Sequence, residues 1–92
     1  MYLEIISPEA VLLSQEVNSI GVPGNAGSFQ VLNNHAPIVS TLGKGTVKIA
    51  SNQTIDLNSE QFQLHHQGNY WMFEINSGIF EMKKNQAILL IE

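Results

Sequence analysis

The sequence contains no cysteine and no arginine, and its only strong bases are Lys44, Lys48, Lys83 and Lys84. Without cysteine, a domain of 92 residues must take its stability from its core or from a partner, which suits a reducing compartment. The net charge is −4 and the lysines form no larger cluster. Binding to nucleic acid or to an anionic membrane requires Lys and Arg to neutralise phosphates, so this composition argues against both.

Long apolar runs are also missing. No window approaches the roughly 20 apolar residues that are needed to span a bilayer. The first residues, MYLEIISPEAVLL, carry no basic leader, and Glu4, Pro8 and Glu9 interrupt the apolar positions. We therefore expect neither a secretory signal nor a transit peptide, and any link to a membrane should run through another protein.

Helical periodicity is hard to find, whereas an alternation of apolar and polar residues recurs along the chain. Val47 and Ile49 alternate with polar neighbours, as do Phe62 and Leu64, and the segment YWMFEIN repeats the pattern over residues 70–76. This spacing places successive side chains on opposite faces of a sheet. The sequence predicts an all-β chain with almost no helix.

Turn-forming residues occur every 8 to 12 positions along the chain. Many short strands at this spacing are typical of an antiparallel sandwich or barrel. The stretch Lys83-Lys84-Asn85-Gln86 predicts a tight hairpin in which Asn85 takes a positive φ, and Gln67-Gly68-Asn69 predicts a similar turn. No linker or repeat is present, so we expect one domain over residues 1–92. The final strand, AILLI, is nearly continuous apolar, so it is either buried on both faces or covered by something else.

Candidate reactive groups are few. His35, His65 and His66 are the only histidines, and the adjacent pair points to opposite faces if its segment is a strand, which argues against a metal site. No nucleophile elbow is present, and VPGNAG lacks both a P-loop lysine and the spaced glycines of a dinucleotide fold. We expect no catalytic residue, no metal and no cofactor. His35 itself is more simply read as a residue that shapes a turn, because nothing titratable lies near it in the sequence.

Several motifs taken in order resemble a known family. The chain opens with YLEIISPE, continues with VNSIGVPGNAGSFQVLNNHAPIVSTLGKGTVKI, and closes with SGIFEMKKNQAILLIE. This order is similar to the N-terminal β-sandwich domain of the epsilon subunit of bacterial F-type ATP synthases. The central pattern is Val22-Pro23-Gly24, Gly27 and Phe29, then Asn34-His35-Ala36-Pro37 and Gly45-x-Val47-x-Ile49.

The resemblance implies a flattened sandwich of about ten strands in two sheets. It also implies a non-catalytic rotor subunit at the foot of the central stalk. Such a subunit binds the gamma subunit and contacts the c-ring, and gamma links it to the catalytic alpha/beta hexamer. Such a subunit couples proton-driven rotation to ATP synthesis from the cytoplasmic face of the bacterial plasma membrane. By this resemblance, Ser7, His35 and Ser40 face gamma, and Asn25, Ala26, Gly27, Ser28 and Phe29 approach the c-ring.

Three departures from the family's pattern carry expectations of their own. Ser28 stands where many relatives have an acidic residue, so we expect a charge-assisted contact to the c-ring to be either weaker here or replaced by a neutral hydrogen bond. Ser77-Gly78 stands in place of a glycine pair. Most relatives also continue as a two-helix hairpin after the sandwich, so a chain that stops at Glu92 is expected to lack helix-mediated inhibition of ATP hydrolysis and to bind no ATP there.

Two other functions compete with this interpretation. The first is a stand-alone β-sandwich that binds a carbohydrate, with Tyr70 and Trp71 as a stacking platform, although aromatic residues at strand spacing more often belong to a core. An exposed Trp71 that lines a groove would favour this function, and a buried Trp71 would oppose it. The second is a small enzyme that uses His35 or the His65-His66 pair, for which the sequence offers no partner acid, base or metal.

Overall fold

The computed structural model describes all 92 residues and contains ten strands and no helix. Since no helix forms, none is long and apolar enough to cross a membrane. The strands are β1 (Tyr2–Ile6), β2 (Val11–Glu16), β3 (Ser19–Gly24), β4 (Gly27–Leu32), β5 (Ile38–Leu42), β6 (Gly45–Ala50), β7 (His65–Gln67), β8 (Tyr70–Ile75), β9 (Gly78–Lys83) and β10 (Gln86–Ile91).

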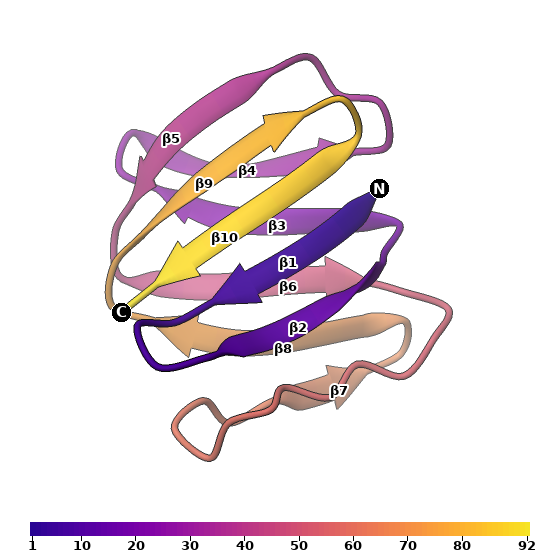
Figure 1. The fold of residues 1–92 in the computed structure, drawn as a ribbon, viewed down its shortest axis with the longest axis vertical. Coiled ribbons are helices and arrows are strands. Elements are labelled where there is room, and N and C mark those ends of the chain that lie inside the picture. The colour runs from indigo at the N-terminus through magenta and orange to yellow at the C-terminus, as the bar shows by residue number, and fades with distance from the viewer.

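The strands form one continuous sheet that curls into two layers (Figure 1). The front layer has the order β2-β1-β10-β9-β5, and the rear layer has the order β4-β3-β6-β8-β7. The layers join where Gly24 of β3 pairs with Leu42 of β5. All pairs are antiparallel except β1 with β10, so the first and last strands lie side by side in the front layer. The predicted all-β sandwich of about ten strands is confirmed.

The space between the layers is filled by a core of 21 buried apolar residues. The alternation in the sequence sets this arrangement, since every second residue of a strand points between the layers. Phe80 of β9 meets Phe29 of β4 edge to face across the core, with ring centroids 6.3 Å apart. Burial of a Leu, Ile or Phe side chain contributes about 1.5–3 kcal/mol, so the core is the main source of stability.

The two turns predicted from the sequence are present. Lys84 and Asn85 have φ values of 51° and 59° in the β9–β10 hairpin, and Gly68 has a φ of 61° between β7 and β8. Positive φ at both central residues matches the right-handed twist of the flanking strands, which explains the tight connection after Lys83.

The prediction of a strand that begins at Phe62 is wrong, because β7 spans only residues 65–67. Phe62 and Leu64 pack against the core from an irregular segment that follows β6. Asn58 of this segment donates its backbone N–H to the Leu12 carbonyl, 2.9 Å away. The alternation of apolar and polar residues therefore predicted correctly that Phe62 and Leu64 are covered. A strand, however, also requires a neighbouring strand with which it can pair, and β8 pairs with this segment only from His65 onward.

Candidate functional site

His35 lies in a tight, exposed turn between β4 and β5. Its backbone N–H donates to the Leu32 carbonyl at 3.3 Å, and Asn34 adopts a φ of 62°. The His35 Nδ1 lies 2.7 Å from the carbonyl oxygen of Ala36, so the ring is oriented by the local backbone. Nowhere do three His, Asp or Glu side chains converge in a way that could hold a metal ion. This geometry presents the imidazole at the surface without a catalytic partner.

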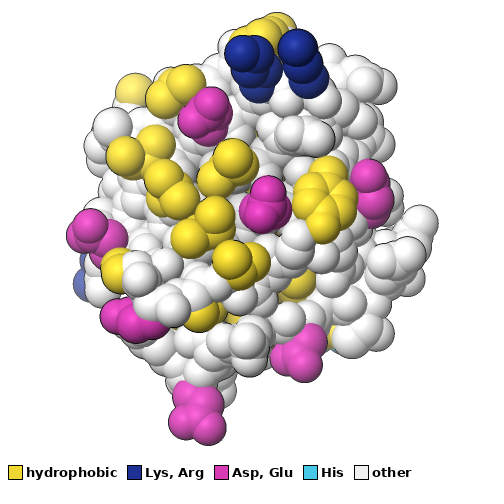
Figure 2. Space-filling model, in the orientation of Figure 1, with side chains coloured by type: hydrophobic (Ala, Val, Ile, Leu, Met, Phe, Trp, Pro, Cys, Tyr) yellow, Lys and Arg dark blue, Asp and Glu magenta, His cyan; other side chains and the backbone are white.

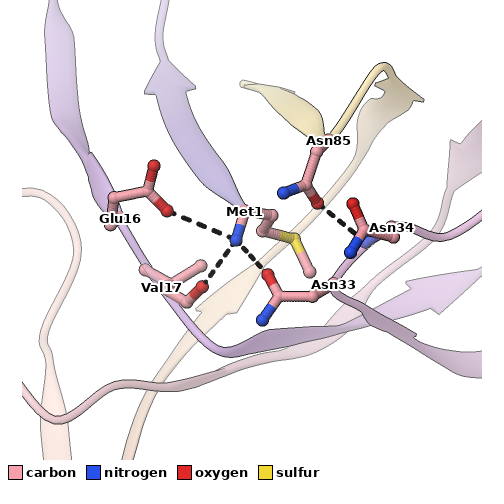
Figure 3. Close-up of polar contacts among 6 residues, drawn as sticks. All are labelled: Met1, Glu16, Val17, Asn33, Asn34 and Asn85. Carbon is pink, nitrogen blue, oxygen red and sulfur yellow. Dashed lines mark hydrogen bonds and ion pairs between the residues drawn. The ribbon is translucent and has the colours of Figure 1, made fainter.

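A cluster of polar contacts fixes this turn to the rest of the front layer (Figure 3). The α-ammonium of Met1 donates to the Val17 carbonyl at 3.0 Å and to the Asn33 side chain, and it lies 3.3 Å from a Glu16 carboxylate oxygen. Beside it, the Asn34 backbone N–H donates to Asn85 Oδ1 at 2.7 Å. These contacts join the turn to the start of β1, the end of β2 and the β9–β10 hairpin, so they hold it in one position.

Ser7 closes the turn between β1 and β2 and is only 9% exposed. Its hydroxyl accepts from the Ala10 backbone N–H at 3.3 Å and donates toward Glu9 at 3.4 Å. The side chain therefore shapes this turn, and little of its surface is free for a partner.

The three serine and histidine positions predicted to face gamma do not lie together. β1, β10 and β5 run in the same direction within the front layer. Ser7 follows the end of β1, whereas His35 precedes the start of β5, so the two residues lie at opposite ends of the layer. Ser40 lies between them and pairs with Phe80, which directs its half-buried side chain to the inner side of the layer.

The residues predicted to approach the c-ring form the β3–β4 hairpin. Asn25, Ala26, Gly27 and Ser28 are exposed, and Phe29 is half-buried because its ring packs against the core. Asn25 donates two hydrogen bonds to Thr41 of β5: its backbone N–H donates to the Thr41 carbonyl at 3.2 Å, and its side-chain Nδ2 donates to Thr41 Oγ1 at 2.9 Å. The hairpin is therefore a firm projection at the same end of the molecule as Ser7.

The outer face of the front layer is apolar to an extent that the sequence did not predict (Figure 2). Val39 is 72% exposed, Ile79 is 44% exposed and Leu90 is 43% exposed. In Figure 2 apolar side chains gather over the front layer, with carboxylates among them. The one feature of the sequence that pointed to this apolar face is the final strand, in which apolar residues occupy both faces. Contiguous exposed apolar surface of this kind commonly marks a protein interface.

The rear layer does not offer the stacking platform that a carbohydrate binder requires. Trp71 is half-buried and packs against the core, and its indole stacks on His66 with ring centroids 3.6 Å apart. The neighbouring Tyr70 ring is covered by the Lys48 ammonium, 4.0 Å from its centroid. Both rings are thus engaged with side chains of the chain itself, which argues against this alternative.

Comparisons with known proteins agree with the order of motifs. The family model described as "ATP synthase, Delta/Epsilon chain, beta-sandwich domain" matches residues 1–59. The ATP synthase epsilon chain of Chlorobaculum tepidum is 37% identical over 90 residues, which cover 98% of this chain and 86% of that protein. The epsilon chain of Leptospira borgpetersenii is 45% identical over 98% of this chain, which spans 59% of that relative's length.

Solved structures share the fold at low sequence identity. A chain from the Tetrahymena thermophila mitochondrial ATP synthase central stalk/c-ring matches with a TM-score of 0.68 and 16% identity, over 99% of this chain and 62% of that chain. A chain from the Euglena gracilis mitochondrial ATP synthase, solved as OSCP/F1/c-ring, matches with a TM-score of 0.71 and 18% identity, over 97% and 48%. These matches establish the fold.

Proposed function

Since the chain belongs to the family of ATP synthase epsilon chains, which are non-catalytic subunits of that complex, we propose that it is a rotor subunit of the central stalk. In this role it binds the gamma subunit and the c-ring, and through gamma it is linked to the catalytic alpha/beta hexamer. It couples proton-driven rotation to ATP synthesis from the cytoplasmic face of a bacterial plasma membrane, as a peripheral protein. The observation that carries this proposal is the match to epsilon chains over 98% of the residues.

The physical properties of the domain suit such a role. A subunit that transmits torque needs a rigid body with broad contact surfaces, because a large packed interface resists shear without any single strong bond. The two layers share one core, and the hairpin and turns at both ends are fixed by hydrogen bonds. Rigid ends and an apolar outer face are the features that such a body requires.

Among the residues that we expect to face gamma, His35 is the best contact and Ser7 the weakest. The His35 side chain is exposed, Ser40 is half-buried and Ser7 is buried. For the c-ring, the exposed tip at Asn25 and Ala26 is the natural point of contact, and Ser28 supplies a neutral hydroxyl beside it.

Single-cysteine variants test these assignments, since the chain has no cysteine of its own. In the isolated chain, His35→Cys should react rapidly with a thiol reagent, Ser40→Cys more slowly and Ser7→Cys slowest, in the order of their exposure. In the assembled ATP synthase, His35→Cys should be protected and should form cross-links to gamma, while a cysteine at Ala26 should cross-link to subunit c.

Two outcomes would overturn parts of the proposal. Cross-links of His35→Cys exclusively to subunits other than gamma would refute the gamma-facing side. Failure of the tagged chain to recover gamma from solubilised membranes, as judged by mass spectrometry, would refute the rotor role itself.

A further inference from the structure

Strand β4 forms a free edge of the rear layer (Figure 1). It pairs with β3 along one side over residues 27–32, without a register shift, and with no strand along its other side. Of the 11 backbone hydrogen bonds outside the strand ladders, only the one from the His35 N–H to the Leu32 carbonyl reaches β4. An unpaired edge of this kind is a template with which another strand can pair.

The strand register shows which backbone groups of β4 point outward. In an antiparallel pair, residues that exchange hydrogen bonds with the neighbouring strand alternate with residues whose N–H and C=O groups point away from it. Ser28 lies opposite Pro23, which has no N–H and whose carbonyl accepts from Gly43 on the side of β5. The backbone groups of Ser28 therefore point away from β3. Those of Gln30 and Leu32 follow the same alternation, in agreement with the outward hydrogen bond of the Leu32 carbonyl.

This edge lacks the features with which proteins normally prevent strand pairing. Such features are charged side chains, prolines, bulges and covering segments. β4 contains no charge and no proline, and no Asp, Glu, Lys or Arg occurs anywhere from Val17 to Gly43. The side chains of Ser28, Gln30 and Leu32 are all exposed.

The other edge strands of the sheet are less open. At β2, the Leu12 carbonyl accepts a backbone hydrogen bond from Asn58, so the segment that follows β6 covers part of this edge. Glu16 also places a charge at the end of β2. β7 comprises only three residues, whereas β4 comprises six. β4 is therefore the edge most suited to pairing.

We propose that two copies of the free chain associate through β4, in antiparallel register about a two-fold axis that passes between their Gln30 residues. Gln30 of one copy then lies opposite Gln30 of the other, and Ser28 lies opposite Leu32. The outward N–H and C=O groups of these residues pair across the axis, so the two rear layers become one continuous sheet. The proposal does not depend on the rotor role, because it concerns the chain before it joins any complex.

The chemistry of the edge favours a second copy over a foreign strand. The Gln30 side chain donates from Nε2 to Ser19 Oγ at 3.3 Å, which leaves one N–H and the Oε1 atom for the amide of the opposing Gln30. Side chains that lie directly opposite each other in a sheet interact in this way. Because the edge carries no charge, it selects neither a basic nor an acidic partner, and self-pairing brings no like charges together.

The nearest charged strand residue on this face is Lys48 of β6. It is in register with Gly21 of β3, which is in register with Gln30, so it lies two strands from the edge. In the proposed dimer, five strand spacings of about 4.8 Å would separate the two lysines, or about 24 Å. This distance exceeds the screening length of about 8 Å at physiological ionic strength, so their repulsion is small.

The test measures self-association of the purified chain by sedimentation equilibrium. We expect the wild-type chain to dimerise with a dissociation constant below about 1 mM. Gln30→Lys and Gln30→Glu should each raise this constant about tenfold, because each places like charges directly opposite each other. An equimolar mixture of the two variants should recover the association of the wild-type chain, since a lysine then faces a glutamate. Gln67→Lys, on the exposed strand β7, is the matched control and should change the constant less than about twofold.

Hydrogen exchange of the wild-type chain provides a second measurement that needs no variant. The amide hydrogens of Ser28 and Gln30 should exchange rapidly in dilute solution and should lose this rapid exchange as the concentration rises and the dimer forms. The amide hydrogen of Phe29, which faces β3, should exchange slowly at both concentrations. Rapid exchange at Gln30 in a solution that sedimentation shows to be dimeric would contradict the proposal.

Three results of the sedimentation experiment would also overturn the proposal. A wild-type chain that stays monomeric up to about 1 mM does not pair through this edge. A dimer that Gln30→Lys leaves intact uses another surface, such as the apolar outer face of the front layer. A mixture of the lysine and glutamate variants that fails to associate lacks the two-fold register about Gln30. None of these results bears on the rotor role, which the recovery of gamma tests separately.

Discussion

Replacement of Phe80 by alanine is expected to lower the free energy of unfolding by about 3–5 kcal/mol. Phe80 is fully buried, and its ring contacts Phe29 from the opposite layer at a centroid distance of 6.3 Å. The substitution removes a large apolar side chain from the only core that the two layers share, and a small domain cannot collapse fully around the space left. Urea denaturation followed by tryptophan fluorescence measures the change, with Trp71 as the single reporter.

The control for this prediction is Leu32→Ala. Leu32 is 56% exposed, so its truncation should change the free energy of unfolding by no more than about 0.5 kcal/mol. If the two variants unfold at the same urea concentration, Phe80 does not hold the layers together and the account of the core is wrong.

Replacement of Gly78 by alanine should destabilise the domain by about 1–3 kcal/mol. A Cβ at this position would lie 2.5 Å from the Leu90 carbonyl oxygen, and that oxygen belongs to a paired strand that cannot move without disturbing β10. Ser77, the residue before Gly78, is half-buried, so its side chain has room. This explains why serine can stand where the family's pattern has the first of two glycines.

Gly21→Ala is the matched control, since it introduces the same methyl group into a strand. The nearest atoms to a Cβ at Gly21 lie 3.7 Å away, which is ordinary contact, and its backbone does not require glycine. This variant should be neutral or more stable by up to about 1 kcal/mol, because alanine restricts the unfolded chain. Equal destabilisation by both substitutions would show that close approach to Leu90 is not the cause.

The sequence was sufficient to predict most of the fold because period-two alternation and turn chemistry are local properties. Asn85 has the positive φ that the hairpin was expected to require, and Phe73 and Phe80 are in the core. The error at Phe62 arose because strand formation also depends on a neighbour far away in the chain. Trp71 was expected in the core and lies at its margin, where His66 covers one ring face.

The apolar outer face of the front layer was less accessible to prediction, for a physical reason. Val11, Ile6, Leu90 and Ile79 lie side by side only because of three features: the parallel register of β1 with β10, the antiparallel register of β10 with β9, and an irregularity between Ile5 and Ile6. None of these registers can be read from the alternation of a single strand. The resemblance implied the partners, but Ser7, His35 and Ser40, which we expect to face gamma, are spread over the layer, so residues expected to share one interface could not be grouped without the fold.

The most direct test of the rotor role is to observe the chain during catalysis. A fluorescent reporter attached at Gln67→Cys, on the exposed strand β7 at the far edge of the rear layer from His35, would follow the chain in single ATP synthase molecules whose catalytic hexamer is immobilised. We predict that the reporter rotates with the central stalk when ATP is added. A reporter that remains bound to the complex but stays fixed relative to the hexamer would contradict the account.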